Sequence, residues 1–301
     1  MDIEKLVNQK LKPGKYVIAV SGGVDSIVLL DIASRIKNLE LVVAHFDHGI
    51  RSDSKLDQQL IQRLAQKYGF VFETQSANLG SNASEQTARE ARYKFLKLVQ
   101  DSHQAKSIIT AHHQDDIIET AIFNLLRGTG RRGVTSLNST DLILRPMLET
   151  TKDQIRQYAL KHNLVWREDS TNQDMKYKRN LIRSKLAVSK DNKSVNKLLG
   201  QITSLKSTNS ELDKALDELL GNLSEDNILD RNKFISLPHK LAVEVMAHWL
   251  RQNKILTFDS KLLNNLVTAS KTYKNGSLFS INKTASLLME TEFLVIKTHI
   301  S

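Results

Sequence analysis

The sequence contains no cysteine, and this absence removes several classes of chemistry. No disulfide, zinc–cysteine site or thiolate nucleophile can form in the chain. Proline is scarce, with three residues, and no apolar run approaches the roughly 20 residues that cross a bilayer. Residues 1–15 carry charges without the apolar segment of a signal peptide, which predicts a cytoplasmic protein with no membrane partner.

The positive charge of the chain is concentrated in its first two thirds. The chain has 301 residues, 40% of them hydrophobic, which favours two globular domains. Its net charge is +10, and residues 1–206 hold 32 Lys and Arg against 22 Asp and Glu, whereas residues 207–301 hold 11 of each. Between residues 176 and 206, Asp191 is the single acid among nine basic residues, which are Lys176, Lys178, Arg179, Arg183, Lys185, Lys190, Lys193, Lys197 and Lys206. Such a basic stripe can neutralise nucleic-acid phosphates, although a solvated helix face has the same composition.

Short β-branched runs alternate with helical patterns in the first half of the chain. Helices are predicted at residues 24–32, 56–68, 84–99 and 117–126. Buried strands are predicted at residues 16–20, 41–44, 70–72 and 107–110. The alternation predicts an α/β fold with a Rossmann-like parallel sheet, helices on both faces, and ligands at the carboxyl ends of the strands.

The pattern changes after Arg183, where the strand signals stop. Residues 184–220 are polar and compatible with helix. Beyond them, helices are predicted at 239–252 and 261–270, and short strands at 278–281 and 293–296. A boundary near residue 206 therefore separates a first domain with a basic helical extension, residues 1–206, from a small, mainly helical domain, residues 207–301.

The loop Ser21-Gly22-Gly23-Val24-Asp25-Ser26 follows the first predicted strand and opens a helix. Gly22 and Gly23 allow a sharp turn and a close approach of backbone N–H groups to an anion, and the helix N-terminus adds positive potential. The serine hydroxyls can donate to phosphate, and Asp25 can hold Mg²⁺ between phosphates. The Walker pattern G-x-x-x-x-G-K-S/T is absent, and an ordinary serine-capped glycine turn is the alternative.

A second glycine-rich segment, residues 128–133, fits the dinucleotide pattern G-x-G-x-x-G. It follows a predicted helix rather than a strand, so its context excludes the dinucleotide interpretation. The glycine and arginine content of this segment still suits a contact with an anion.

Three acids follow the fourth predicted strand. Asp115 and Glu119 share one face of the predicted helix, and Asp116 lies beside them. These acids can bind Mg²⁺, orient an ammonium group or accept its proton, while capping of the helix is the alternative. On the preceding helix, Arg89 and Arg92 can stabilise a phosphate or a leaving pyrophosphate, or form surface ion pairs.

The six loop residues match the pyrophosphate-loop motif S-G-G-x-D-S in full, and they resemble the N-type ATP pyrophosphatases, which cleave ATP to AMP and pyrophosphate. In this superfamily, enzymes that transfer sulfur or release ammonia from glutamine use cysteine. The lack of cysteine leaves ammonia-dependent NAD synthesis and amine ligation.

Further motifs resemble, in their order, the tRNA(Ile)-lysidine synthase family. The resemblance is dense from residue 16 to about 186 and weaker from 227 to about 270, and we expect the further C-terminal domain of longer members to be absent. The motifs lie at residues 45–51, 88–93, 110–120, 126–130, 145–148, 166–172 and 177–183.

The resemblance implies that ATP adenylates O2 of the wobble cytidine, C34, in tRNA(Ile) with anticodon CAU. Free L-lysine then displaces AMP from C2, and the tRNA reads AUA and accepts isoleucine. Residues 1–206 would form the PP-loop catalytic domain and residues 207–301 a tRNA-binding domain, and the family suggests a homodimer. The implied residues are Asp25, Asp115, Asp116, Glu119 and Arg179 for catalysis; Ser21, Gly22, Gly23, Val24, Asp25, Ser26, Arg92, Arg127 and Gly128 for ATP; Asp25 and Asp115 for Mg²⁺; and Arg179, Asn180 and Arg183 for tRNA.

Three other functions fit parts of the sequence. The histidines His45, His48, His112 and His113, with nearby aspartates, suggest a metal-dependent phosphohydrolase, which leaves the phosphate loop unexplained. An ammonia-dependent PP-loop ligase of the NAD synthetase type leaves the basic stripe and the second domain unexplained. A non-catalytic RNA-binding protein accounts for the stripe but not for the loop.

Overall fold

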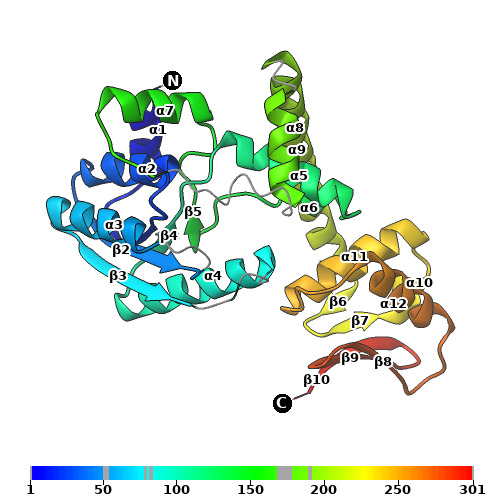
Figure 1. Cartoon of the computed structure of the whole chain (residues 1–301). Coiled ribbons are helices and arrows are strands. Elements are labelled where there is room, and N and C mark those ends of the chain that lie inside the picture. The colour runs from blue at the N-terminus through cyan, green and yellow to red at the C-terminus, as the bar shows by residue number, and fades with distance from the viewer. Residues whose placement is uncertain are drawn as a thin grey trace. The chain divides into compact units, whose positions relative to one another are not determined.

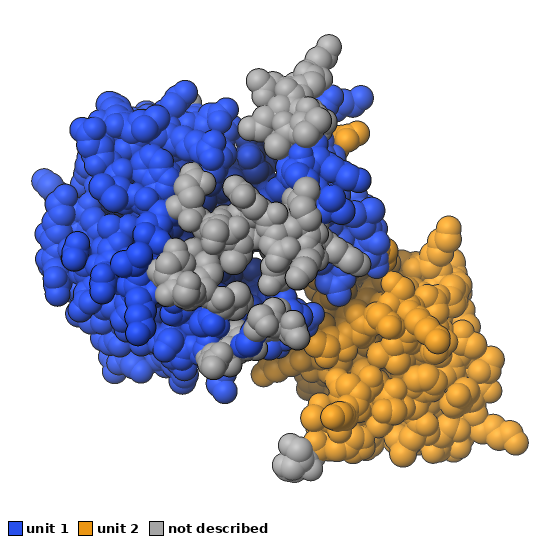
Figure 2. Space-filling view, viewed as in Figure 1, with its two compact units in different colours: residues 1–127, 134–199 blue, residues 128–133, 200–301 orange. Residues whose placement is uncertain are grey.

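The computed structural model describes residues 2–49, 54–77, 80, 84–167, 178–188 and 192–299. The chain forms two compact units (Figure 2). Unit 1 consists of residues 1–127 and 134–199, and unit 2 consists of residues 128–133 and 200–301. The segment 128–133 therefore belongs to the second unit, although it directly continues the chain of the first.

A five-stranded parallel sheet forms the centre of unit 1 (Figure 1). Its strands lie in the order β3-β2-β1-β4-β5, and each neighbouring pair is parallel. The order reverses between β1 and β4, so the ends of these two strands form the switch point where sheets of this kind bind ligands. The strands are β1 (Gly14–Ala19), β2 (Leu39–Asp47), β3 (Val71–Ser76), β4 (Ser107–Ile109) and β5 (Ile143–Leu144).

Helices cover both faces of this sheet. Val17 and Ile18 are adjacent on β1 but belong to opposite cores, because successive strand side chains point to opposite faces. Ile18 packs with α1, α2, α3 and α7, whereas Val17 packs with α4 through Phe95 and Leu96. The helices of unit 1 are α1 (Ile3–Lys10), α2 (Val24–Ser34), α3 (Ser54–Tyr68), α4 (Glu85–Ser102), α5 (Gln114–Leu126), α7 (Lys152–Lys161) and α8 (Lys178–Val188). The short helix α6 (Arg131–Val134) lies mostly in the segment 128–133 of unit 2.

The predicted α/β class, with its parallel sheet and covering helices, is confirmed. All four predicted strands and the four helices of this region are present, with their ends shifted by a few residues. The fifth strand, β5, is not predicted, because a two-residue strand leaves no periodic pattern. Within the described ranges, no helix combines the length and apolar character that crossing a membrane requires.

A long helix, α9 (Asn192–Gly221), carries the chain from unit 1 into unit 2. Its 30 residues correspond to a length of about 45 Å. The division after Leu199 and the predicted boundary at residue 206 both lie inside this helix.

Unit 2 combines helices with a C-terminal antiparallel sheet. The predicted helices at 239–252 and 261–270 are confirmed, as are the short strands at 278–281 and 293–296. Three further strands complete a sheet in the order β6-β7-β10-β9-β8, so the second domain holds more strand than the sequence analysis predicts. The elements are α10 (Arg231–Ile235), α11 (His239–Gln252), α12 (Ser260–Thr272), β6 (Ser224–Glu225), β7 (Ile228–Asp230), β8 (Ser277–Asn282), β9 (Ala285–Met289) and β10 (Phe293–Thr298).

Candidate active site

The loop between β1 and α2 has a conformation that requires glycine. Gly22 has a φ of +91°, and a Cβ there would lie 3.4 Å from the Cβ of Asp57. The hydroxyl of Ser26 accepts from the N–H of Ser21 (3.2 Å) and donates to the carbonyl of Gly23 (2.9 Å). Gly23 is the N-cap of α2, and no side chain among the described residues caps this helix. The first N–H groups of α2 are thus left for an acceptor such as phosphate.

Arg167 holds this loop, although it lies 145 residues beyond Gly22 in the chain. Its backbone N–H donates to the carbonyl of Gly22 (3.0 Å), and its Nε donates to Oδ1 of Asp57 (2.6 Å). The side chain of Asp57 is only 3% exposed, so this charge-assisted bond is shielded from water. Arg167 belongs to the motif at 166–172, of which residues 168–172 lie outside the described residues.

Lys152 faces Asp25, a residue of the loop that the sequence analysis assigns to catalysis and Mg²⁺. The Nζ of Lys152 donates to Oδ1 (2.6 Å) and Oδ2 (2.7 Å) of Asp25. Both side chains are about one quarter exposed, at 26% and 28%. The sequence analysis misses Lys152, which brings a positive charge to the start of α2.

His113 joins the loop to the start of α5. It is the N-cap of α5, and its Nδ1 accepts from the N–H of Asp115 (3.3 Å). The carboxylate of Asp116 accepts in return from the N–H of His113 (2.9 Å), which completes a capping box. The Nε2 of His113 lies 3.8 Å from Oδ1 of Asp25 and 3.6 Å from Oδ2 of Asp116. His113 and Asp116 therefore cap helix α5 and also lie at the switch point of the sheet, close to Asp25.

Arg183 brings the basic helix α8 to the acids of α5. Its Nε donates to both carboxylate oxygens of Glu119, at 2.7 and 2.8 Å, and its Nη2 lies 3.4 Å from Oδ1 of Asp116. Glu119 is 8% exposed, whereas Arg183 is 40% exposed. The guanidinium thus offsets part of the cost of burying this carboxylate, while Arg183 remains partly open to solvent.

The two buried acids of α5 have pKa values shifted in opposite directions. Burial raises the pKa of Asp116, but His113, His112, the N–H of His113 and Arg183 outweigh burial, and the pKa falls below its ordinary value. Burial also raises the pKa of Glu119, and Arg183 only partly offsets this effect, so the pKa stays above its ordinary value. Asp116 is therefore a fixed negative charge at neutral pH.

The predicted ATP-binding residues outside the loop lie in two places. Arg92 is among the charged groups that act on His112, close to the end of β4. Arg127 and Gly128 follow the other end of α5, about 16 Å along the helix from Asp116. The structure therefore groups Arg92 with the acids and separates Arg127 and Gly128 from them.

Two residues assigned to tRNA binding, Arg179 and Asn180, begin α8. Their side chains lie outside the described residues. Arg183, the third residue of this set, contacts Glu119 as described above.

The histidines do not assemble a metal cluster. In the described part of the chain, no group of three or more His, Asp or Glu side chains is placed to hold a metal ion. The Nδ1–H of buried His45 instead donates to the carbonyl of Val20 (2.9 Å). These described residues give the metal-dependent phosphohydrolase interpretation no support. A Mg²⁺ ion that is held mainly by phosphates requires only one or two carboxylates, so Asp25 and Asp115 stay a predicted site.

The glycine-rich segment 128–133 is fastened within unit 2 by its arginines. Arg131 contacts Asp213 (2.9 Å) and Glu244 (3.0 Å), and Arg132 contacts Asp213 (2.6 Å). Arg132 also donates to Nδ1 of His248 (2.9 Å). These guanidinium groups bind carboxylates of the protein, so their charge is already balanced.

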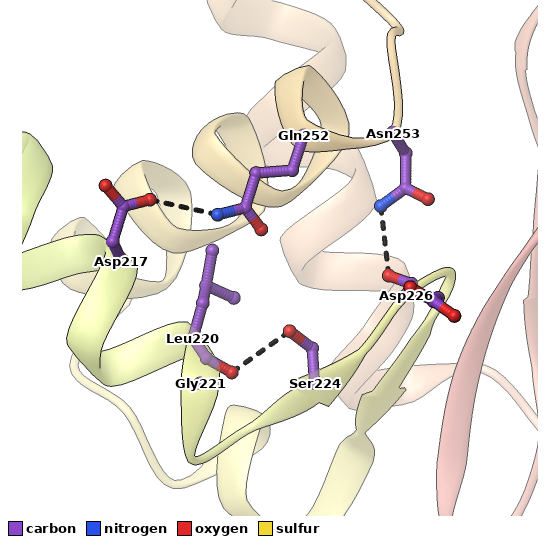
Figure 3. Close-up of a pocket in the computed structure, with 7 residues that line it drawn as sticks. All are labelled: Asp217, Leu220, Gly221, Ser224, Asp226, Gln252 and Asn253. Atoms are coloured by element: carbon purple, nitrogen blue, oxygen red, sulfur yellow. Dashed lines mark hydrogen bonds between the residues drawn. The ribbon is translucent and has the colours of Figure 1, made fainter.

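A pocket of about 300 Å³ in unit 2 is lined by polar groups that bond to one another (Figure 3). The amide of Gln252 donates to Asp217 (2.9 Å), and the amide of Asn253 donates to the carbonyl of Asp226 (3.2 Å). No basic residue lines this pocket. Its carboxylates disfavour an RNA phosphate there, in agreement with the zero charge balance of residues 207–301.

Comparison with known proteins places the chain among nucleotide-binding α/β domains. The model of a family described as the PP-loop domain matches residues 1–189. A tRNA(Ile)-lysidine synthase from Nostoc sp. is 39% identical over 181 residues, which cover 57% of this chain and 53% of that protein. A tRNA(Ile)-lysidine synthase from Thermotoga maritima is 35% identical over 187 residues, covering 58% and 45%. The chain thus spans about half the length of these curated relatives.

Solved structures agree on the fold. The U34-tRNA thiolase NcsA from Methanococcus maripaludis is similar with a TM-score of 0.50 at 16% sequence identity. The match covers 66% of this chain and 78% of that chain.

Proposed function

The chain belongs to the PP-loop family, and from this premise we propose that it is a tRNA(Ile)-lysidine synthase of the cytoplasm. In this proposal it ligates L-lysine to C2 of the wobble cytidine, C34, of tRNA(Ile) with anticodon CAU. ATP is consumed, and AMP and pyrophosphate are released. The modified tRNA then reads AUA and accepts isoleucine. The names of the curated relatives support this assignment.

One observation supports the proposal most strongly: the phosphate loop and the acids follow the neighbouring strands β1 and β4. Adjacent strands lie about 4.8 Å apart, so the two sets of side chains share one edge of the sheet. His113 connects them, at 3.8 Å from Asp25 and 3.6 Å from Asp116. A base adenylated over the loop is then within reach of an amine held by the acids.

In the first step, O2 of the cytosine attacks the α-phosphorus of ATP, and the bond from this phosphorus to the bridging oxygen breaks. Pyrophosphate leaves with the electron pair of that bond. Ser21 and the first N–H groups of α2 stabilise the phosphate oxygens, and Lys152 adds positive charge beside them. The hydroxyl of Ser26 holds the loop in place through Ser21 and Gly23. Asp25 and Asp115 would hold Mg²⁺, which would neutralise further phosphate charge.

In the second step, the ε-nitrogen of lysine attacks C2, and the bond from C2 to O2 breaks, so that AMP leaves with this oxygen. Free lysine is mostly protonated, because its ε-amine has a pKa of about 10.4. The ionised Asp116 holds the ammonium group, and Asp115 or Asp116 takes its proton. Replacing each by Asn, with adenylation followed separately from lysine transfer, tests this role, because loss of the base slows transfer more than adenylation. Unchanged transfer in both variants removes the assignment.

The remaining parts of the chain are proposed to bind the tRNA. Arg179, Asn180 and Arg183 lie in the basic region 176–206, which includes α8 and part of α9, and its cations suit the RNA backbone. Unit 2 is proposed to recognise the tRNA by shape and local contacts rather than by bulk charge. The active form is proposed to be a homodimer, which light scattering of the purified chain tests.

Pyrophosphate release without lysine tests the proposed function. The chain is mixed with ATP and an unmodified tRNA(Ile) transcript, and a transcript with C34 replaced by U is the matched control. The proposal predicts pyrophosphate release with the first transcript only. Release that requires ammonium ions and no RNA would instead support the NAD synthetase type of ligase.

A further inference from the structure

Three cationic side chains surround an aromatic ring beside the acids of unit 1. The guanidinium carbon of Arg89 lies 4.7 Å from the centre of the Tyr93 ring, and that of Arg92 lies 5.5 Å from it. Arg145 lies next to the hydroxyl of Tyr93. All three arginines act on His112, whose Nδ1 is 2.8 Å from the hydroxyl of Thr110. We call Arg89, Tyr93, His112 and Arg145 the arginine pocket.

The strand topology explains why these residues meet. Arg145 directly follows β5, and His112 lies three residues beyond β4, so both stand at the carboxyl ends of adjacent strands. Helix α4 is the crossover from β3 to β4, and its N-terminal half, with Arg89 and Tyr93, begins at the same edge. The arginine pocket is therefore part of the ligand-binding edge of the sheet.

The arginine pocket carries positive charge that the described residues do not balance. Arg145 is only 7% exposed, and its Nη1 donates to the carbonyl of Asn138. The pKa of Arg145 is lowered by burial and by Arg89 and is raised by Tyr93, and no carboxylate contributes to it. The Arg145 side chain interacts with the Tyr93 hydroxyl, but among the described residues no acceptor is placed for the Nε of Arg145 or for the proton of that hydroxyl. Buried charges and donors in proteins are normally paired, so this set is built to receive an anion.

His112 interacts with Asp116 of α5 and with the arginines of this cluster. Burial lowers its pKa to about 3; Asp116 opposes the shift, and Arg145, Arg92 and Arg89 add to it. A neutral imidazole thus adds no charge of its own beside the arginines.

We propose that the arginine pocket binds a phosphate group of a substrate, with Arg145 and Tyr93 as its buried donors and Arg89 as its outer cation. A planar guanidinium matches two phosphate oxygens, and the Tyr93 hydroxyl supplies a further donor. The pocket lies at β4 and β5, about 10 Å across the sheet from the end of β1, so it is distinct from the loop at Ser21 to Ser26. The phosphate comes either from the pyrophosphate part of ATP or from the RNA beside the target base. Only this choice of source rests on the proposed function.

Binding measurements on the full chain test the assignment without turnover. Titration calorimetry with inorganic pyrophosphate forms one arm, and an unmodified anticodon stem-loop RNA with CAU forms the other. The variants are Arg145→Gln, Arg89→Gln and Tyr93→Phe, of which the last removes a single hydroxyl. Arg156→Gln, an exposed arginine on α7, is the matched control for loss of charge.

We expect Arg145→Gln to weaken the binding of one of the two ligands about 10- to 100-fold and Tyr93→Phe to weaken the binding of the same ligand several-fold. Arg156→Gln should leave the affinity for both ligands unchanged. Loss in the pyrophosphate arm assigns the pocket to ATP. Loss in the RNA arm, with the slope of log K against log salt reduced by about 0.7 to 0.9, assigns it to the RNA backbone. Unchanged binding in both arms for folded Arg89→Gln and Tyr93→Phe overturns the proposal, even if Arg145→Gln does not fold. Failure of lysine transfer leaves these outcomes unaffected.

Discussion

The Nζ of Lys152 lies 2.6 Å and 2.7 Å from the two carboxylate oxygens of Asp25, a residue 127 positions earlier in the chain. Lys152 is the first residue of α7, where the partial positive charge of the helix N-terminus disfavours a cation. The carboxylate of Asp25 offsets this repulsion. Lys152 thus keeps its positive charge at a helix N-terminus, where a cation is unfavourable, and beside the phosphate-binding loop. This position fits a catalytic role better than a structural one.

Replacing Lys152 by Ala is expected to slow adenylation about 100-fold, because the α-phosphate loses a nearby positive charge in the transition state. Lys152→Arg should recover part of the rate. The measurement is RNA-dependent pyrophosphate release. Lys10→Ala is a matched control, because Lys10 forms an exposed pair with Glu149 at the same kind of distance (2.8 Å), and its rate should stay unchanged. Equal rates for Lys152→Ala and the wild type would remove Lys152 from the mechanism.

Gly22→Ala is expected to abolish ATP binding. The φ of +91° is unfavourable for a residue with a side chain, so alanine would strain the loop or change its conformation. Calorimetric titration with ATP measures the effect. Gly200→Ala lies in helix α9 with open space around its Cβ position and is expected to bind ATP normally. Normal ATP affinity in Gly22→Ala would show that the loop does not need this conformation.

The phosphate loop could be predicted from the sequence, whereas the contact of Lys152 with Asp25 could not. The strands, the loop and the acids of α5 are predictable, because each depends on residues a few positions apart. The pairs Lys152–Asp25 and Arg183–Glu119 join residues 127 and 64 positions apart, and no local pattern predicts such pairs. One local signal existed for Lys152, since Thr151 and Gln154 form a capping box that marks the start of α7.

The sheet of unit 2 was predictable only in part. Strand β9 alternates Ala285, Leu287 and Met289 on the buried face, but five residues give a weak signal beside the stronger helices. β6 and β7 have two and three residues, and they are strands only because they pair with each other and with β10. Tertiary pairing, rather than local preference, determines them.

His112 is expected to make the protein less stable as the pH falls. Burial lowers its pKa to about 3, whereas the unfolded chain has an ordinary histidine pKa of about 6.5. Between these values the unfolded state binds the extra proton, so the contribution of neutral His112 is present above pH 6.5 and is lost as the pH falls toward 3. Denaturant unfolding of wild type and His112→Gln measures it. The stability difference should fall by up to about 2 kcal/mol between pH 6.5 and 5; a constant difference would contradict the assignment.

Asp213→Asn is expected to loosen the segment 128–133. Asp213 accepts from both Arg131 (2.9 Å) and Arg132 (2.6 Å), so the variant leaves two guanidinium groups with weaker partners. Trypsin cleaves after arginine, and the rate of cleavage at Arg131 and Arg132 should rise several-fold in the native protein. Glu218→Gln, an exposed acid on the same helix α9, is the control and should keep the wild-type rate. Equal protection in both variants would show that these ion pairs do not hold the segment.

Transfer of labelled lysine to RNA tests the central claim most directly. The full chain is incubated with ATP, labelled L-lysine and an unmodified tRNA(Ile) transcript, and the RNA is digested to locate the label. The account predicts one label per tRNA at C34, with one AMP and one pyrophosphate released for each lysine, and no label with Asp25→Asn. Release of AMP and pyrophosphate by the folded protein with no label in the RNA would contradict it.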